Sequence, residues 1–195
     1  MLAQLPNLIS LGRLGCAPAV VWAVLTGRHE LAFWLFFVAG VSDAVDGLLA
    51  KRLGATSVLG AWLDPLADKT LLVGACIALA SGGGLPLWLV VMVVFRDLLI
   101  VGGAIVVQTM TFRLVVEPLI VSKVNTAAQI GLLAAALAGP AFGVSFPQVF
   151  EIGVVTVATT TLLSGVAYVV TWVRRVNAWE RDTARNEAGG DRAGP

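Results

Sequence analysis

The stretch VSDAVDGLLAKRLGATSVLGAWLDPLADK, from Val41 to Lys69, decides how this sequence is interpreted, because it sets acidic side chains within apolar sequence. Four of its residues are aspartates: Asp43, Asp46, Asp64 and Asp68. Ionisable side chains at membrane depth are costly to bury, and by default they indicate a functional site. The first question is therefore whether the surrounding chain crosses a membrane.

The composition indicates that it does. Of the 195 residues, 58% are hydrophobic and 13% are charged, and the mean hydropathy is +0.90. A soluble domain is closer to about half apolar and a quarter charged. We expect an all-α integral membrane protein, with six transmembrane helices in one bundle and room for a short amphipathic helix before the first. The apolar runs place these helices at about residues 8–26, 31–51, 58–81, 85–108, 123–141 and 148–174.

Basic residues are distributed unevenly between the two ends of these helices. The end opposite the termini carries Arg28, and the end that shares its side with both termini carries Arg13, Lys51, Arg52, Arg113, Lys123, Arg174, Arg175, Arg181, Arg185 and Arg192. Because Lys and Arg favour cytoplasmic segments, we expect both termini and the aspartates to face the cytoplasm. A multi-pass protein of a bacterial inner membrane is the predicted setting.

The C-terminal residues differ in composition from the rest. We expect residues 1–175 to form the membrane domain and residues 176–195 to form a polar cytoplasmic tail, helical at first and then partly disordered. The N-terminus shows neither the basic start nor the cleavage site of a signal peptide, so none is expected. The net charge of +1 gives no indication of a nucleic-acid partner.

The four aspartates fall on two helix faces that are joined by a short link. Residues spaced by three, four, seven or eight positions share one face of a helix. The first face carries Asp43, Asp46, Gly47 and Ala50, and the second carries Gly60, Asp64 and Asp68. We expect the two faces to meet near the cytoplasmic membrane surface.

Converging carboxylates repel one another unless positive charge lies between them. Mg²⁺ and Mn²⁺ take carboxylate oxygens together with phosphate oxygens, so the pattern predicts a divalent-cation site that also accepts a phosphate. The small residues on the two faces would leave a slot for a flat group or a pyrophosphate, although they also suit close helix packing. The structural alternative is that each acid pairs with Lys or Arg and holds the bundle together.

These residues resemble the signature of the CDP-alcohol phosphotransferases, D-x2-D-G-x2-A-R-x8-G-x3-D-x3-D. All spacings match, and one position departs, because Lys51 stands where the signature has arginine and Arg52 follows it. A bidentate fork is thereby replaced by a point charge. Either Lys51 or Arg52 could fill the role of the signature arginine.

The resemblance implies six transmembrane helices, usually as a homodimer, and a site for two divalent ions, Mg²⁺ or Mn²⁺. It implies that Asp43, Asp46 and Asp64 are metal ligands, and that Asp68 both binds metal and acts as the general base. It also implies a CDP-linked donor, here CDP-diacylglycerol, bound by Gly47, Ala50, Lys51, Arg52 and Gly60.

The signature does not identify the acceptor, so the acceptor has to be inferred from residues outside it. The candidates for binding it or a phosphate are Arg96, Lys123, Asn125 and Arg113. Arg96 and Asp97 are adjacent on a helix, so they are expected to point in different directions and need not pair. Asn125 and Gln129 share a helix face, where interhelical hydrogen bonds are the alternative; for Lys123 the alternative is a snorkelling interface residue.

The stretches LPNLIS…R, which ends at Arg13, FRD and VSKVNTA resemble the CMP-forming cardiolipin synthases of this family. That resemblance implies phosphatidylglycerol as acceptor, with cardiolipin and CMP as products. Phosphatidylglycerophosphate synthases, which use glycerol 3-phosphate, are the alternative. A metal-ion transporter is a remote alternative, because it should carry polar residues across the whole membrane depth, and the far-side halves of these helices are almost bare.

Overall fold

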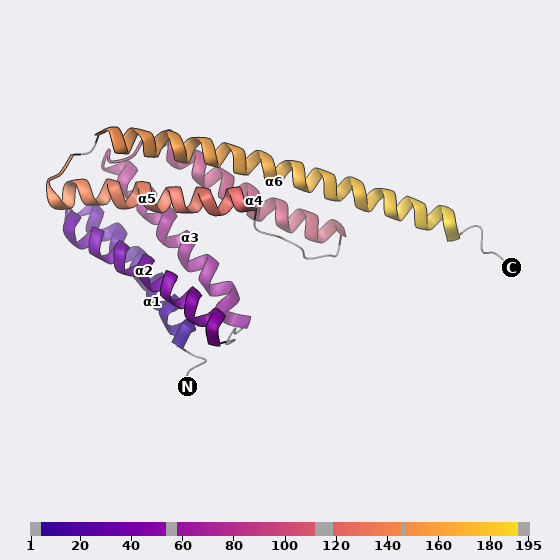
Figure 1. Cartoon of the computed structure of the whole chain (residues 1–195), viewed down its shortest axis with the longest axis horizontal. Helices are drawn as coiled ribbons and strands as arrows, with labels where there is room; N and C mark the ends of the chain where they lie inside the picture. Colours follow the sequence, from indigo (N-terminus) through magenta and orange to yellow (C-terminus); the bar gives the residue numbers. More distant parts are fainter. Residues whose placement is uncertain (1–4, 54–57, 112–118, 146, 191–195) are drawn as a thin grey trace. The chain divides into compact units, whose positions relative to one another are not determined.

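The computed structural model describes residues 5–53, 58–111, 119–145 and 147–190, with side chains described for 11–42, 67–107, 109, 119–145, 147–177 and 181. Within these ranges the chain forms six α-helices and no strand, which confirms the predicted all-α class (Figure 1). The helices are α1 (Leu5–Leu25), α2 (His29–Leu53), α3 (Val58–Ser81), α4 (Leu87–Thr111), α5 (Ile120–Phe142) and α6 (Pro147–Gly190). The amphipathic piece expected before the first helix falls partly on residues 5–7, which are the first residues of α1.

Three helices are long and apolar enough to cross a membrane, judged on the residues whose side chains are described. They are Leu87–Val107 of α4, Ile120–Phe142 of α5 and Pro147–Asn177 of α6, with mean hydropathies of 2.4, 1.4 and 1.7. The helices α1 and α2 contain shorter apolar stretches, Leu11–Leu25 and His29–Ser42. A membrane-embedded helical protein is therefore supported, and crossing by α1, α2 and α3 stays a prediction.

Outward-facing apolar side chains agree with a lipid surrounding. On α4, Phe95, Leu98, Val101 and Ile105 recur every three or four residues and are each more than half exposed. A stripe of this kind would be unfavourable in water, whereas lipid tails are as apolar as the side chains themselves. We assign this face of α4 to the hydrocarbon.

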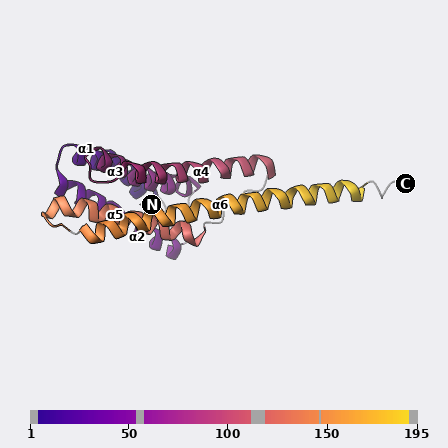
Figure 2. The same ribbon diagram turned by 90° about the horizontal axis from the view of Figure 1, so that it is seen from above.

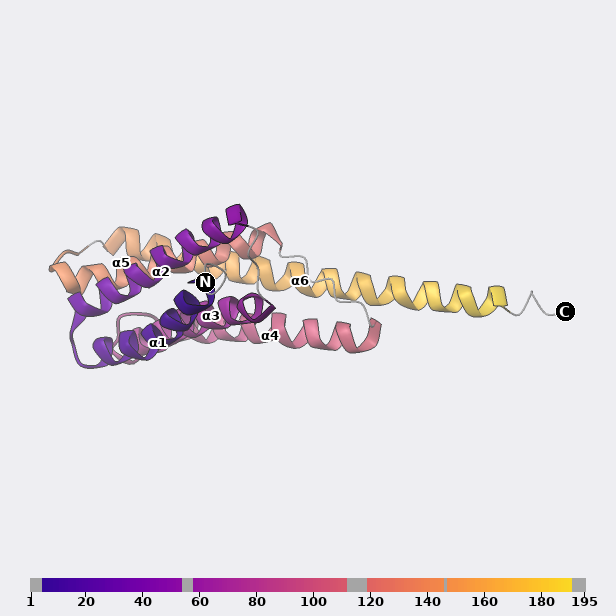
Figure 3. The ribbon, with the colours of Figure 1, turned by 90° about the horizontal axis from the view of Figure 1, so that it is seen from below.

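The chain divides into two compact units, residues Met1–Val91 with Ala127–Val157, and residues Met92–Thr126 with Ala158–Pro195. In the first unit α1 packs on both α2 and α3, and α1 runs beside α3 in Figures 2 and 3. Small side chains let these helices approach closely. The buried alanines of this core are Ala17, Ala23, Ala32, Ala39, Ala67, Ala75 and Ala78.

One contact shows how tightly α1 and α3 pack. A Cβ atom at Gly74 of α3 would lie 3.1 Å from Cγ2 of Val21 in α1. A side chain added at this point would require Val21 to shift by a few tenths of an ångström. The close approach of α1 to α3 is the feature of the fold that positions the site described below.

Two further features complete the first unit. Phe142, the last residue of α5, packs edge-on against Phe33 of α2, with ring centroids 5.0 Å apart. The helix α3 ends in a turn in which Gly83 has a φ of 75° and the Gly84 amide donates to the Leu79 carbonyl over 2.8 Å. Only glycine adopts that conformation without strain.

The interior of the second unit is polar. Its described buried side chains include Arg96, Asp97, Asn125, Thr161 and Ser164, all at most 9% exposed. Its longest element is the part of α6 from Ala158 to Gly190, which continues past Arg175 as expected for the start of the tail (Figure 1). The predicted boundary at residue 175 lies inside this continuous helix, and the division into membrane domain and tail stays a prediction.

Candidate functional site

The structure places the acidic signature on two consecutive helices. Asp43 and Asp46 lie in the second half of α2, and Asp64 and Asp68 lie in the first half of α3. Of the four, only Asp68 has a described side chain. The side chains of the other signature residues lie outside the described set, namely Asp43, Asp46, Gly47, Ala50, Lys51, Arg52, Gly60 and Asp64. Convergence of the four acids therefore stays a prediction.

Asp68 is held by an arginine that the acidic signature does not include. Nη1 of Arg13, in α1, donates a hydrogen bond to Oδ1 of Asp68 and forms an ion pair with it. The side chain of Arg13 is 2% exposed and that of Asp68 is 38% exposed. A buried cation thus lies behind a carboxylate that keeps more than a third of its surface open.

A second polar centre forms around Arg96 of α4, within the second unit. Its Nε donates to the hydroxyl of Ser164 in α6 over 3.2 Å, and its Nη2 donates to the hydroxyl of Ser122 in α5 over 2.6 Å and also to Ser164. The guanidinium carbon also lies 5.9 Å from the centre of the Tyr168 ring. One guanidinium therefore links three helices.

The expectation that Arg96 and Asp97 need not pair is wrong for this molecule. Nη1 of Arg96 donates to Oδ1 of Asp97 over 2.8 Å, and both side chains are buried. Adjacent helix positions do point apart, but the arginine side chain is long enough to curl back toward its neighbour. Pairing reduces the cost of burying both charges at membrane depth.

Asn125 makes interhelical hydrogen bonds, which was one of the two roles that the sequence allowed for it. Its Oδ1 accepts hydrogen bonds from the hydroxyls of Thr160 and Thr161 in α6, over 2.8 and 2.9 Å. Asn125 is 0% exposed, and its Nδ2 has no hydrogen-bond partner among the described atoms. The amide thus joins α5 to α6 and retains a buried donor.

The remaining acceptor candidates are placed differently. Lys123, near the start of α5, is exposed. Gln129 is 3% exposed, and its Nε2 has no partner among the described atoms. Arg113 lies outside the described residues. Arg96, Lys123 and Asn125 all belong to the second unit, and of these Arg96 and Asn125 are buried.

Sequence reasoning missed the hydroxyl side chains that complete this centre. The partners of Arg96 and Asn125 are Ser122, Thr160, Thr161 and Ser164, with Tyr168 beside the guanidinium. A signal for the α6 residues was present, because Thr161, Ser164 and Tyr168 recur at three and four positions in an apolar helix. Arg13 closes the stretch LPNLIS…R that resembles the cardiolipin synthases, but its spacing gave no indication of its partner, which lies 55 positions away.

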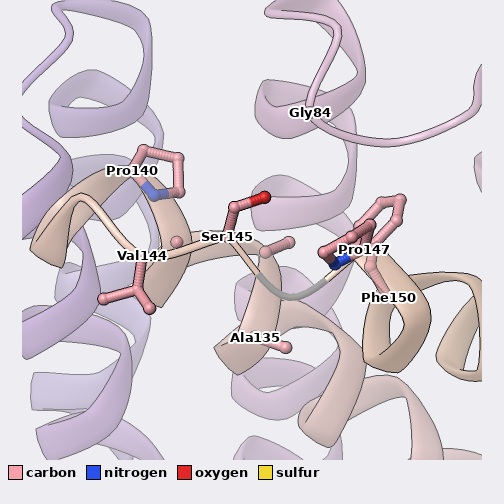
Figure 4. Close-up of a pocket in the computed structure, with 9 residues that line it drawn as sticks. Gly84, Ala135, Pro140, Val144, Ser145, Pro147 and Phe150 are labelled. Carbon is pink, nitrogen blue, oxygen red and sulfur yellow. The ribbon is translucent and has the colours of Figure 1, made fainter.

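A pocket of about 380 Å³ opens in the first unit between the end of α5 and the start of α6 (Figure 4). In that view Pro140 and Val144 lie on one side, and Pro147 and Phe150 lie on the other, with Ser145 between them. The nine residues that line it carry no charged side chain. Among these nine residues, the hydroxyl of Ser145 is the one polar side-chain group.

The fold and the site together define the class of this chain as a helical membrane protein. It carries a partly open carboxylate on α3 and buried polar side chains in its membrane helices. Residues 3–173 match the family described as CDP-alcohol phosphatidyltransferase. The match covers most of the chain, and it includes the whole acidic signature. The chain belongs to the CDP-alcohol phosphatidyltransferase family, and the resemblance on which the expectations rest is confirmed.

Curated relatives of two kinds are similar to this chain. It is 40% identical over 184 residues to the chloroplastic CDP-diacylglycerol–glycerol-3-phosphate 3-phosphatidyltransferase 1 of Oryza sativa subsp. japonica, covering 85% of this chain and 56% of the relative. It is 33% identical over 182 residues to the CMP-forming cardiolipin synthase of Rattus norvegicus, covering 84% and 60%. A probable phosphatidylglycerophosphate synthase of Mycobacterium tuberculosis is 33% identical over 186 residues, covering 90% and 84%.

The chain spans 56% and 60% of the length of the rice and rat relatives that it matches. Both kinds of relative, cardiolipin synthases and phosphatidylglycerophosphate synthases, match over similar stretches and at similar levels of identity. Family membership therefore leaves the choice of acceptor open.

Proposed function

We propose that this protein transfers the phosphatidyl group of CDP-diacylglycerol to a hydroxyl of phosphatidylglycerol, giving cardiolipin and CMP. The observation that carries the class of reaction is the family match over residues 3–173 together with the complete spacing of the four aspartates. Asp68 adds a partly open carboxylate within that signature. We also propose a homodimer in a bacterial inner membrane, with the site facing the cytoplasm.

The donor set fits divalent cations. Four carboxylates on two consecutive helices are hard oxygen ligands of the kind that Mg²⁺ and Mn²⁺ prefer. Asp43, Asp46, Asp64 and Asp68 would hold two such ions. When bound, ions of this kind neutralise a pyrophosphate and stabilise the charge that develops on the leaving phosphate.

The side chains of the signature would perform the remaining work. Gly47, Ala50 and Gly60 would leave space for the cytidine and pyrophosphate, and Lys51 or Arg52 would contact a phosphate. Asp68 would accept the proton of the acceptor hydroxyl. The acceptor oxygen then bonds to the phosphorus that carries diacylglycerol, the bond from that phosphorus to the bridging oxygen breaks, and CMP leaves with that oxygen.

Two observations favour a lipid acceptor. The outer stretches LPNLIS, FRD and VSKVNTA resemble cardiolipin synthases, as set out above. In addition, the guanidinium of Arg96 is already engaged by Asp97, Ser122 and Ser164. A phosphodiester carries one negative charge, whereas glycerol 3-phosphate is a dianion that needs more basic groups. An arginine neutralised by its neighbour suits the monoanion better.

Glycerol 3-phosphate is the second candidate acceptor. It is favoured by the rice relative, whose name includes that substrate and whose identity to this chain is 40%. The exposed Lys123 could contribute to a dianion pocket. The two candidates share the donor, the acidic signature and the released CMP, and they differ in the acceptor alone.

Purified full-length protein supplied with radiolabelled CDP-diacylglycerol, Mn²⁺ and one acceptor at a time tests both. Labelled cardiolipin formed from phosphatidylglycerol is the expected result. Labelled phosphatidylglycerophosphate formed from glycerol 3-phosphate would overturn the acceptor and keep the class of reaction. Absence of CMP release with both acceptors would contradict the transferase and return the metal-ion transporter to consideration.

A further inference from the structure

Arg13 is a charged residue inside the first unit that the proposed chemistry does not use. On α1 it shares a face with Ala17 and Val20, which are 1% and 0% exposed, and its own side chain is 2% exposed. A buried cation is costly unless a partner of opposite charge compensates it. Its partner is Asp68 of α3, through Nη1 and Oδ1.

The two members of this pair differ in their exposure. Arg13 is enclosed, whereas Asp68 keeps 38% of its side-chain surface open. A pair that only joined α1 to α3 would need no open carboxylate. The helices also contact each other elsewhere, because Gly74 of α3 lies against Val21 of α1. The open side of Asp68 calls for another explanation.

The chemistry of the guanidinium supplies an explanation for the open side of Asp68. A planar guanidinium directs its hydrogen bonds along fixed directions, so it restrains the rotation of a carboxylate more than a freely rotating ammonium does. Because Arg13 is held in the packed α1–α3 contact, it offers Asp68 a rigid support from behind. Asp68 lies four positions after Asp64, on the face that the signature predicts to be acidic.

We propose that Arg13 is a positioning residue that holds Asp68 in the orientation needed to receive the proton of the acceptor hydroxyl. The proposal rests on the function proposed above for Asp68. Arg13 itself contacts neither donor nor acceptor in this role. Its removal should therefore slow the chemical step and leave donor affinity largely unchanged.

The test compares Arg13→Gln and Arg13→Lys with wild type in steady-state kinetics, using CDP-diacylglycerol and the acceptor that the wild type accepts. We expect Arg13→Gln to lower kcat by about 100-fold, because a misplacement of the order of 1 Å costs this much. The KM for CDP-diacylglycerol should stay within about twofold. Arg13→Lys should recover only part of kcat, because it restores the positive charge beside Asp68 without the fixed hydrogen-bond directions of the guanidinium.

Arg28→Gln is the matched control. Arg28 follows α1 in sequence, is exposed and stacks on the Trp22 ring at 4.8 Å from its centre. It lies outside the proposed machinery, so its loss should leave kcat and KM unchanged. The unfolding temperature and the folded fraction in detergent are measured for every variant.

Three results would overturn the proposal. Arg13→Gln could turn over at the wild-type rate; both Arg13 variants could lose kcat only in proportion to their folded fraction; or KM could rise while kcat stays unchanged. Asp68→Asn separates this failure from failure of the proposed function. If the wild type is inactive or Asp68→Asn is fully active, the base assignment fails, and the role of Arg13 fails with it. If Asp68→Asn is inactive and Arg13→Gln is fully active, only the role of Arg13 fails.

Discussion

Arg96 of α4 donates a hydrogen bond from Nε to the hydroxyl of Ser164 in α6, and both side chains are at most 4% exposed. A guanidinium at membrane depth is tolerated when its donors are matched by acceptors. Ser122 and Asp97 accept from its other nitrogens. The centre therefore stabilises the second unit, and it sets the charge that Arg96 could offer to an acceptor.

Ser164→Ala should destabilise the protein by roughly 1–2 kcal/mol, because it removes an acceptor from a buried charged donor. Thermal unfolding of purified protein in detergent measures the loss. Ser81→Ala is the matched control, since Ser81 is exposed at the end of α3 and its hydroxyl donates to the Ala78 carbonyl of its own helix. Equal unfolding temperatures for the two variants would contradict the role assigned to Ser164.

Gly103 of α4 lies against the indole ring of Trp172 in α6, and a Cβ at this position would overlap the ring. Gly102, its neighbour, has open space at the same position. Gly103→Ala should therefore cost about 1–3 kcal/mol through overpacking. Gly102→Ala should be neutral or stabilise by up to about 1 kcal/mol, because alanine favours the helix. Thermal unfolding compares the two, and a destabilised Gly102→Ala beside an unaffected Gly103→Ala would reverse the prediction.

The helices could be predicted from sequence because each rests on a local pattern. The run predicted at residues 85–108 corresponds to α4 at Leu87–Thr111, and the boundary moves little because Pro86 and the glycines before it end the preceding turn. The helix α6 continues past Arg175, since the polar residues that follow include good helix formers such as Ala, Glu and Arg. Apolar run length and helix propensity are both readable without tertiary contacts.

The contacts within the candidate site could not be predicted in the same way. Arg13 and Asp68 are 55 positions apart, and their pairing depends on how α1 packs on α3. Arg96 pairs with its neighbour because its side chain bends, which residue spacing does not encode. The signature aspartates were identified by spacing on a helix face, which is local. Partner identity is a property of packing, and so it appears only in the structure.

Asp68→Asn should abolish turnover and leave part of the donor binding intact. The amide keeps the shape of the side chain but cannot accept the hydroxyl proton, so kcat should fall by roughly 10²–10⁴-fold. Turnover is measured as CMP release, and donor affinity is measured separately with labelled CDP-diacylglycerol. Glu151→Gln makes the same chemical change at an exposed position of α6 and should be without effect. Full activity in Asp68→Asn would rule out its role as base.

Asp43→Ala and Asp46→Ala should each lose both metal and donor affinity. Removing one carboxylate takes a ligand from the predicted two-ion site. The affinity for Mn²⁺ should then fall by about 10-fold or more, because losing even a hydrogen-bond partner of a metal ligand reduces affinity by that much. Titration of the full chain with Mn²⁺, followed by electron paramagnetic resonance, reports the affinity without requiring turnover. Glu30→Ala is the matched control, because Glu30 is an exposed acid in the first turn of the same helix, α2. If Mn²⁺ binds Asp43→Ala and Asp46→Ala as tightly as it binds the wild type and Glu30→Ala, these aspartates are not ligands, and the acidic faces of α2 and α3 must serve another purpose.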